Sequence, residues 1–313
     1  MKKVLVVLCM LLSLVGCGSN AKYNVGILQF TQHEALDKAT EGFKDVLIEE
    51  FGNDIAFNYQ NASGDTGTCL IMATDLVSDN VDLIMANATP ALQSVANATN
   101  NIPVLGTSIT EYGVALYISN FDGLVGTNIS GTSDLAPLDE QAQMILDLFP
   151  NTKKVGIIYC IGEANSKYQV ETVSKYLQAK GIEVNSYSFS DSNDVNNAAV
   201  AACDESDVIY IPTDNTCASN GGLISNVASK KNIPIITGEK DTLLAVNGLA
   251  TLSIDYYELG RTTGKMAAKI LKGESKVSEM PIEYYANPVK MYQKEVADRY
   301  GLTMSEEYIE IEE

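Results

Sequence analysis

The chain has 313 residues with 40 acidic and 21 basic side chains, which gives a formal net charge of −19. This acidity argues against nucleic acid as a partner and against docking on anionic lipid, because both require basic patches. A single histidine, His33, and the absence of any Cys-x-x-Cys pair argue against a metal site and a Ser-His-Asp triad, so we expect no cofactor.

The N-terminus is typical of an export signal. Two lysines precede the apolar run VLVVLCMLLSLV, which has the length of a signal-peptide core and is too short to span a bilayer permanently. The sequence LVGC, which ends at Cys17, resembles the bacterial lipobox, in which the first mature cysteine carries lipid. We therefore predict a lipoprotein signal peptide over 1–16, a tether over 17–22 and a lipid anchor to the cell membrane, on the outer face in a Gram-positive bacterium. An ordinary secretory signal with a chance cysteine is the alternative.

The mature chain contains an internal duplication. YNVGILQF matches KKVGIIYC, VDLIMANATPA matches SDVIYIPTDNT, and NIPVLGTS matches NIPIITGE, in the same order along the chain. The matched segments lie 130, 125 and 131 positions apart. Three matches at nearly one spacing indicate a repeated unit of about 130 residues.

Each unit alternates short apolar runs with helical patterns. In the first unit we predict strands at 24–30, 54–60, 81–86 and 102–106, and helices at 34–51, 68–79 and 90–99. In the second unit we predict strands at 154–160, 182–189, 207–212 and 234–237, and helices at 164–180, 193–203 and 217–231. This alternation implies parallel sheets with right-handed crossovers. The predicted fold class is therefore α/β, with two doubly wound parallel-sheet lobes that meet at a cleft.

The segment 249–273 adds a strand and a helix that we expect to cross back to the first lobe. Within it, GRTTGKM is similar to a phosphate-binding loop. Its spacing is one residue short, however, and Met266 stands where that loop needs a hydroxyl, so we interpret it as a helix face. The predicted lobes are 23–133 plus about 254–280, and 134–253 plus about 281–313.

Polar side chains follow nearly every predicted strand at its carboxyl end. One such end alone would be explained by a helix cap. Ligands of open parallel α/β sheets bind beyond these ends, so the recurrence favours a polar small-molecule site in the cleft. The predicted ligand-binding residues are Phe30, His33, Thr89, Thr107, Ser108, Asp134, Tyr159, Asn165, Ser166, Thr213, Asp214, Asn215 and Glu239.

The motifs ATP, GTSD, EANS, PTDNT and IDYYELGR, together with the export signal and the duplication, resemble the ABC-transporter substrate-binding proteins of the tryptophan/tyrosine-binding type. The resemblance covers about residues 23 to 290 and implies a type I periplasmic-binding fold, in which two lobes joined by a hinge close on ligand. It also implies a protein that is not an enzyme and that delivers an aromatic amino acid (tryptophan, tyrosine or phenylalanine) to a permease and its ATPase. We expect a monomer. The stretch SITEYGVALYISNFDGLVG departs from the proline- and glycine-containing loop of the family.

The zwitterionic ligand that this resemblance implies needs donors for its carboxylate and acceptors for its ammonium. Thr89, Ser108 and the backbone N–H groups after Asn165 suit the carboxylate. Asp214 and Glu239 suit the ammonium. The alternative for Asp214 is a helix cap, and the alternative for Glu239 is a solvated loop.

Phe30 and Tyr159 are candidates for the apolar wall of the site. Core packing is the alternative for Phe30, and an exposed helix start is the alternative for His33. Two other functions stay open: a receptor that passes the same ligand to a sensor, and an exported enzyme on an α/β scaffold. The absence of a G-x-S-x-G motif and of metal-ligand clusters weighs against the enzyme.

The mature domain contains four cysteines after the lipobox, at positions without metal-like spacing: Cys69, Cys160, Cys203 and Cys217. An exported protein can form disulfides, but a chain of this length does not need them for stability. We expect these side chains to be free, small and partly buried.

The lipobox hypothesis predicts that Cys17→Ala prevents lipid attachment, because the thiol is the acceptor. Metabolic labelling with a radioactive fatty acid, followed by separation of membrane and soluble fractions, measures this. The expected product is uncleaved or soluble and carries no label. A Cys17→Ala protein that is still matured and labelled would show that the lipobox interpretation is wrong.

Overall fold

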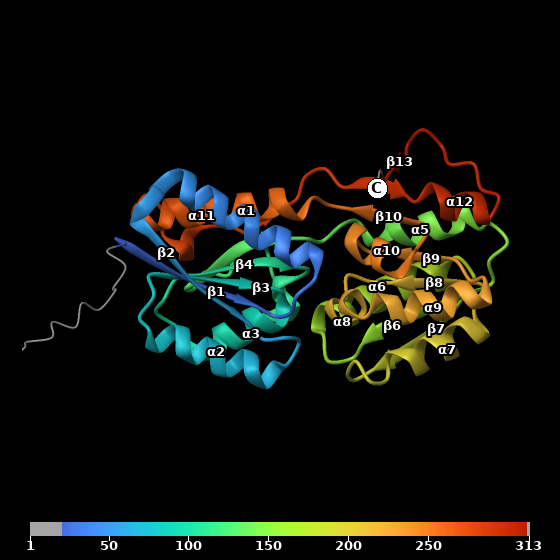
Figure 1. The fold of residues 1–313 in the computed structure, drawn as a ribbon, viewed down its shortest axis with the longest axis horizontal. Coiled ribbons are helices and arrows are strands. Elements are labelled where there is room, and N and C mark those ends of the chain that lie inside the picture. Colours follow the sequence, from blue (N-terminus) through green and yellow to red (C-terminus); the bar gives the residue numbers. More distant parts are fainter. Residues whose placement is uncertain (1–20, 312–313) are drawn as a thin grey trace, which may run out of the picture.

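The computed structural model describes residues 21–311, so the predicted signal peptide and Cys17 lie outside the described residues. Two α/β lobes lie side by side along the long axis of the molecule (Figure 1), and each contains one sheet with helices on both faces. The predicted fold class of two doubly wound parallel-sheet lobes is confirmed.

The first sheet is parallel throughout and has the order β11-β5-β4-β3-β1-β2. Its strands are β1 (Tyr23–Gln29), β2 (Ile55–Asn61), β3 (Leu83–Asn87), β4 (Val104–Ile109), β5 (Ile129–Ser133) and β11 (Glu283–Tyr284). The helices of this lobe are α1 (Glu34–Phe51), α2 (Thr66–Ser78), α3 (Thr89–Ala98), α4 (Tyr112–Ala115) and α11 (Tyr256–Leu271), with short 3₁₀ turns at Gly52–Asp54 and Val277–Glu279.

The second sheet has the order β13-β12-β10-β9-β8-β6-β7, and only β12 runs antiparallel to its neighbour β10. Its strands are β6 (Lys154–Cys160), β7 (Glu183–Phe189), β8 (Val208–Ile211), β9 (Ile235–Thr237), β10 (Ala250–Ser253), β12 (Val289–Tyr292) and β13 (Ile309–Glu310). Its helices are α5 (Leu138–Leu148), α6 (Ala164–Ala179), α7 (Val195–Glu205), α8 (Asn215–Ser219), α9 (Gly221–Lys231), α10 (Lys240–Val246) and α12 (Lys294–Arg299).

The hydrophobic patterns of the sequence account for these elements. Strands β3 and β4 are buried on both faces, as their continuous apolar runs require when helices cover a parallel sheet. Helix α1 buries Leu36, Phe43 and Leu47 along one stripe. The predicted helix over 217–231 is interrupted at Asn220, which separates α8 from α9. There Gly221 lies so close to Ala245 that a Cβ would come within 2.6 Å of that side chain.

Helix α11 returns to the first lobe and packs along α1, as Figure 1 shows. The segment GRTTGKM is part of α11, so the interpretation as a helix face is confirmed. Two glycines allow the helices to approach closely. A Cβ added at Gly260 would overlap the backbone carbonyl of Ala39, and one added at Gly42 would overlap that of Tyr257.

The chain crosses between the lobes three times, at 134–137, 254–255 and 285–288. Two of these crossings are joined by the hydroxyl of Tyr256, which donates to Oδ2 of Asp134 at 2.9 Å. Strand β11 still pairs with β5, so the chain leaves the first sheet after Tyr284, slightly later than the boundary of about 281 expected from the sequence.

Within residues 21–311, Cys69, Cys160, Cys203 and Cys217 are free thiols, as expected, and all four are buried. This part of the chain has no helix that is long and apolar enough to cross a membrane. It also has no cluster of side chains suited to hold a metal ion.

The close approach of α1 and α11 predicts that Gly260→Ala destabilises the protein by about 2–3 kcal/mol, because the new methyl group meets rigid backbone. The control is Gly222→Ala in α9, where no atom lies within 4 Å of the added Cβ, and this variant should be neutral or slightly stabilising. Urea unfolding of both variants measures the difference. Equal stability of the two would contradict this packing.

Candidate functional site

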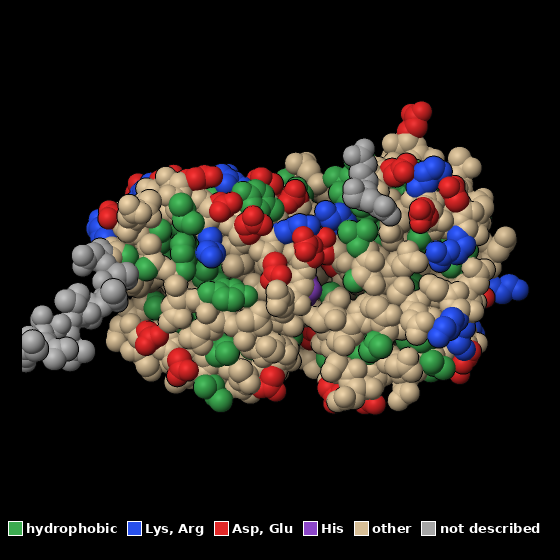
Figure 2. Space-filling view, viewed as in Figure 1, with side chains coloured by type: hydrophobic (Ala, Val, Ile, Leu, Met, Phe, Trp, Pro, Cys, Tyr) green, Lys and Arg blue, Asp and Glu red, His purple; other side chains and the backbone are tan. Residues whose placement is uncertain are grey.

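A cavity between the two lobes receives side chains from the carboxyl ends of both sheets. Its volume is about 10 Å³, which is room for about one water molecule. Figure 2 shows the seam between the lobes, with the purple histidine at its centre. The lining residues are His33, Ala35, Leu36, Ser108, Thr110, Asp134, Asn165, Thr213, Asp214, Asn215, Ala218, Glu239, Thr242 and Tyr256.

Most of the residues predicted from strand ends line this cavity. Those that do are His33, Ser108, Asp134, Asn165, Thr213, Asp214, Asn215 and Glu239. Five others do not: Phe30, Thr89, Thr107, Tyr159 and Ser166. Thr107 is buried within the first lobe, where it shares a 3.3 Å hydrogen bond with Thr132. Phe30 is also buried, but it lines a neighbouring pocket between the lobes together with Glu163, Asn215 and Ser219. Tyr159 packs against the core of the second lobe, and Ser166 is fully buried in α6.

Six lining residues were not predicted from the sequence: Ala35, Leu36, Thr110, Ala218, Thr242 and Tyr256. Thr110 and Tyr256 closely follow β4 and β10, so a rule that extended strand ends by one to three residues would have included them. Ala35, Leu36 and Ala218 are apolar helix residues and give no such signal.

Five of the lining residues carry a buried polar atom that has no hydrogen-bond partner. These atoms are His33 Nδ1, Ser108 Oγ, Asp134 Oδ1, Asn165 Oδ1 and Thr242 Oγ1. Only two other side-chain atoms in residues 21–311 share this property. A buried polar atom without a partner costs about 1–3 kcal/mol. Their concentration around one cavity therefore indicates a site that a polar ligand completes.

Asp134 supplies the negative charge at the hinge side of the cavity. Its Oδ2 accepts the hydroxyl of Tyr256, whereas Oδ1 has no partner. Burial raises the pKa of Asp134 to about 6, and the hydrogen bond from Tyr256 opposes this rise. A cation beside Oδ1 would relieve the cost of keeping this carboxylate ionised.

Asp214 has a different environment, because it caps α8. Its Oδ1 accepts the backbone N–H of Cys217 at 2.8 Å, and its Oδ2 accepts that of Cys160 at 2.7 Å. Burial, and then the charge of Glu163, raise the pKa of Asp214 above its usual range. Both carboxylate oxygens of Asp214 therefore already accept a backbone N–H group. The ammonium role expected for Asp214 therefore stays a prediction, and the geometry favours Asp134 for it.

Glu163, a strand-end residue that was not among the predicted ligand-binding residues, accepts hydrogen bonds from the first turn of α8. Its Oε1 accepts the backbone N–H and the hydroxyl of Thr216 at 2.9 and 2.8 Å. Its Oε2 accepts the backbone N–H and the side-chain amide of Asn215 at 3.1 and 2.5 Å. The first N–H groups of α8 are thus already bonded to carboxylates, and none is left for a ligand.

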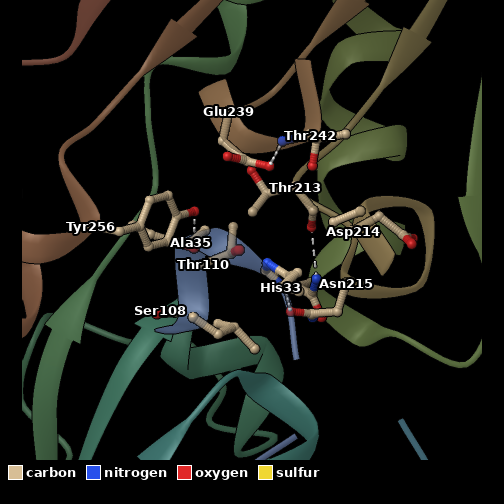
Figure 3. A pocket seen from close by; sticks show the side chains of 14 residues that line it. His33, Ala35, Ser108, Thr110, Thr213, Asp214, Asn215, Glu239, Thr242 and Tyr256 are labelled. Atoms are coloured by element: carbon tan, nitrogen blue, oxygen red, sulfur yellow. Dashed lines mark hydrogen bonds between the residues drawn. The ribbon is translucent and has the colours of Figure 1, made fainter. Parts of the chain in front are cut away.

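Glu239 caps α10 in the same way. Its Oε2 accepts the backbone N–H of Asp241 at 2.6 Å, and its Oε1 accepts that of Thr242 (Figure 3). Burial, and then the charge of Asp241, raise the pKa of Glu239. The solvated-loop alternative for Glu239 is wrong, since its side chain is buried and bonded to backbone.

Three side-chain contacts connect the lobes beside the cavity. His33 Nε2 lies 3.1 Å from Asn215 Oδ1, and Thr31 Oγ1 lies 3.4 Å from Ser219 Oγ. Lys38 forms an ion pair with Asp241 at 3.3 Å, and Asp241 is largely buried. All three start from the β1–α1 region and end on α8 or α10. This face of the first lobe therefore lies directly against the second.

Ser108 reaches the cavity through an unusual backbone conformation. Its φ is 56°, in the left-handed region that residues other than glycine rarely adopt. It lies where the register between β4 and β5 shifts, between Gly106 and Ile109. Such strain is typical of residues whose position serves a site.

The family model of the ABC transporter substrate-binding proteins matches residues 24–311, almost the whole described chain. The chain belongs to this family. It is 37% identical over 267 residues to the tyrosine-binding protein of Clostridioides difficile, a match that covers 84% of this chain and 76% of that one. These findings agree with the two-lobed fold and with a binding site between the lobes.

Two solved members of the family differ in how closely they superpose on the present structure. A Streptococcus pneumoniae ABC domain in complex with L-Trp has a TM-score of 0.86 at 31% identity, covering 91% of this chain and 97% of that one. The ligand-free, open structure of a substrate-binding protein with adhesive properties from Clostridium difficile has a TM-score of 0.69 at 33% identity, covering 93% and 100%. The present structure is thus more similar to the L-Trp complex, although the identities are nearly equal.

The capping role of Asp214 in this substrate-binding protein predicts that Asp214→Ala lowers the free energy of unfolding by about 2–3 kcal/mol, because two backbone N–H groups lose their acceptor. The control is Asp65→Ala, which removes an exposed cap from Thr68 N–H and should cost about 1 kcal/mol. Chemical denaturation of both variants compares the losses. A smaller loss for Asp214→Ala than for Asp65→Ala would contradict the capping role.

Proposed function

We propose that this protein is an extracytoplasmic, lipid-anchored receptor of an ABC importer. It binds an aromatic amino acid in the cleft between its lobes and delivers it to a permease and its ATPase. The family match and the names of the relatives that bind tyrosine or L-Trp support this proposal. The observation that carries it is the set of five unpartnered polar atoms around the cavity, which includes a carboxylate oxygen.

Asp134 accepts the ligand ammonium in this proposal. Its Oδ1 is buried, negatively charged when ionised, and unpartnered, and Tyr256 fixes the orientation of the carboxylate through Oδ2. By contrast, Asp214 and Glu239 already accept backbone N–H groups with both oxygens. The ammonium therefore gains most by approaching Asp134.

The ligand carboxylate needs hydrogen-bond donors, and the cavity offers hydroxyl groups for this purpose. Ser108 Oγ and Thr242 Oγ1 are buried without partners, from the first and second lobe respectively. Either hydroxyl can donate. The apolar side chain of the ligand meets Ala35, Leu36 and Ala218, which are the apolar lining residues, rather than Phe30 and Tyr159.

The lobes are closed in this structure, and the ligand enters when they separate. The close similarity to the L-Trp complex supports a closed state, as do the contacts of His33, Thr31 and Lys38 with the second lobe. Because the volume of the cavity is only about 10 Å³, an amino acid cannot occupy it without a rearrangement. The three crossing segments at 134–137, 254–255 and 285–288 provide the hinge for that opening.

The proposal predicts that Asp134→Asn weakens amino-acid binding by roughly ten- to a hundredfold, since a hydrogen bond to a charged group contributes about 1.5–3 kcal/mol. Calorimetric titration measures it. Asp65→Asn, which changes the exposed cap of α2 outside the cavity, is the control and should bind normally. Unaltered affinity in Asp134→Asn would place the ammonium elsewhere.

The same site predicts a pH dependence of binding. The pKa of Asp134 is raised to about 6 without ligand, and a bound ammonium favours the ionised form. Affinity should therefore rise as pH increases through about 6, and binding near that pH should release a proton. Titration in buffers of different ionisation enthalpy detects the proton. The release should be smaller in Asp134→Asn, in which Asp214 and Glu239 keep their raised pKa values, and an unchanged release would show that Asp134 is not its source.

A further inference from the structure

The hydrogen bonds around Asn215 fix the orientation of its side-chain amide. One side of the amide faces Glu163 Oε2 at 2.5 Å, and the other faces His33 Nε2 at 3.1 Å. Oε2 of Glu163 also accepts the backbone N–H of Asn215, so this oxygen acts as an acceptor. The amide group beside it is therefore the NH₂ donor, and the carbonyl oxygen Oδ1 faces the histidine.

This orientation fixes the tautomer of His33. A carbonyl oxygen accepts only, so the ring nitrogen that faces it, Nε2, must carry the hydrogen. Burial lowers the pKa of His33 and favours the neutral ring. In a neutral imidazole with hydrogen on Nε2, Nδ1 presents a lone pair. That nitrogen is buried beside the cavity without a partner, and it can only accept a hydrogen bond.

The cavity contains acceptors besides Asp134 Oδ1, and His33 Nδ1 is one of them. Asn165 Oδ1 is a further acceptor, because the Nδ2 of this residue donates to the carbonyl of Thr213 at 2.9 Å. Tyr256, which binds Asp134, lies on the opposite side of the cavity from Asn215, the partner of His33 (Figure 3). A hydrogen bond to His33 Nδ1 therefore needs a second donor on the ligand, separate from the ammonium at the hinge.

We propose that His33 determines specificity by accepting a hydrogen bond from a donor on the aromatic side chain of the ligand, a phenol O–H or an indole N–H. Glu163 acts as a positioning residue through Asn215. This inference rests on the proposed function and narrows its ligand class. Phenylalanine offers no such donor and would leave Nδ1 unpartnered, so the site disfavours it.

The tautomer is directly measurable, because His33 is the only histidine in the chain. In protein labelled with ¹⁵N-histidine, NMR should show Nε2 protonated and Nδ1 unprotonated. Addition of the bound amino acid should shift the Nδ1 resonance, since this nitrogen then accepts a hydrogen bond. In Glu163→Gln, the new amide can donate to Asn215 or accept from it, so the Asn215 amide is no longer held in one orientation. His33 can then carry its hydrogen on either ring nitrogen, and the chemical shifts of the two ring nitrogens should converge. A purely structural role of Glu163 would leave them unchanged.

The specificity is tested by calorimetry with matched ligands: tyrosine against phenylalanine, and tryptophan against its benzothienyl analogue, which has sulfur in place of the indole N–H. Wild-type protein should prefer the donor-bearing member of the pair it binds by at least about tenfold, equivalent to 1.4 kcal/mol. In His33→Leu the ratio of the two affinities should fall close to one, and the ligand that lacks the donor should bind nearly as tightly as it binds to the wild-type protein. In His33→Gln, which retains a donor and an acceptor on one side chain, part of the ratio should return.

The outcomes separate this inference from the proposed function. Two results would overturn the role of His33 and leave the receptor function standing. In one, the wild-type protein binds aromatic amino acids with no preference for those that carry a donor. In the other, the preference for a donor is kept in His33→Leu. An Nδ1 that NMR shows protonated also overturns the role of His33. Wild-type protein that binds none of these amino acids overturns both.

Discussion

Polar atoms that leave water must find new partners, and this constraint organises the cleft. In each lobe the carboxyl ends of parallel strands deliver hydroxyl, amide and carboxylate groups to one edge, and the approach of the lobes buries them. Most find partners in the protein: Glu163 and Asp214 bond the start of α8, and Glu239 bonds the start of α10. Five of the seven buried side-chain atoms in residues 21–311 that do not are on residues that line one cavity. In the proposed function the ligand is the missing partner of these atoms, and its binding stabilises the closed arrangement of the lobes.

The buried carboxylates show how similar residues serve different purposes. Asp214 and Glu239 precede helices of only five and seven residues, whose backbone N–H groups depend on caps for much of their hydrogen bonding. Asp134 precedes no such helix. It lies in a segment that crosses between the lobes, and it accepts a hydrogen bond from Tyr256, the first residue of α11, directly after the second crossing. A ligand ammonium on Asp134 would therefore act on the hinge itself, which couples binding to the relative position of the lobes.

Periodicity and duplication predicted the fold, because strand and helix patterns are local and a parallel sheet imposes its own connectivity. The site was harder to predict. The strand-end rule selected His33, Ser108 and Asp134, but it also selected Thr107, which the structure buries inside a lobe, and Phe30, which lines a neighbouring pocket. Neighbouring residues at a strand end point in opposite directions, so sequence alone does not say which one faces the cleft. Asp134 accepts a hydrogen bond from Tyr256, which is 122 residues away in the sequence. Glu163 accepts the backbone N–H of Thr216 at the start of α8. Both contacts depend on the tertiary structure and give no local signal in the sequence.

We expect a bound amino acid to contact the unpartnered atoms of the cleft, above all Asp134 Oδ1. A crystal structure of the protein with its tightest-binding aromatic amino acid would show these contacts. The ligand ammonium should lie at a charge-assisted hydrogen-bond distance of about 2.8 Å from Asp134 Oδ1, with Asp214 still bonded to the backbone N–H groups of Cys160 and Cys217. An ammonium that binds Asp214 instead, or a ligand that leaves Asp134 Oδ1 without a partner, would rule out this assignment.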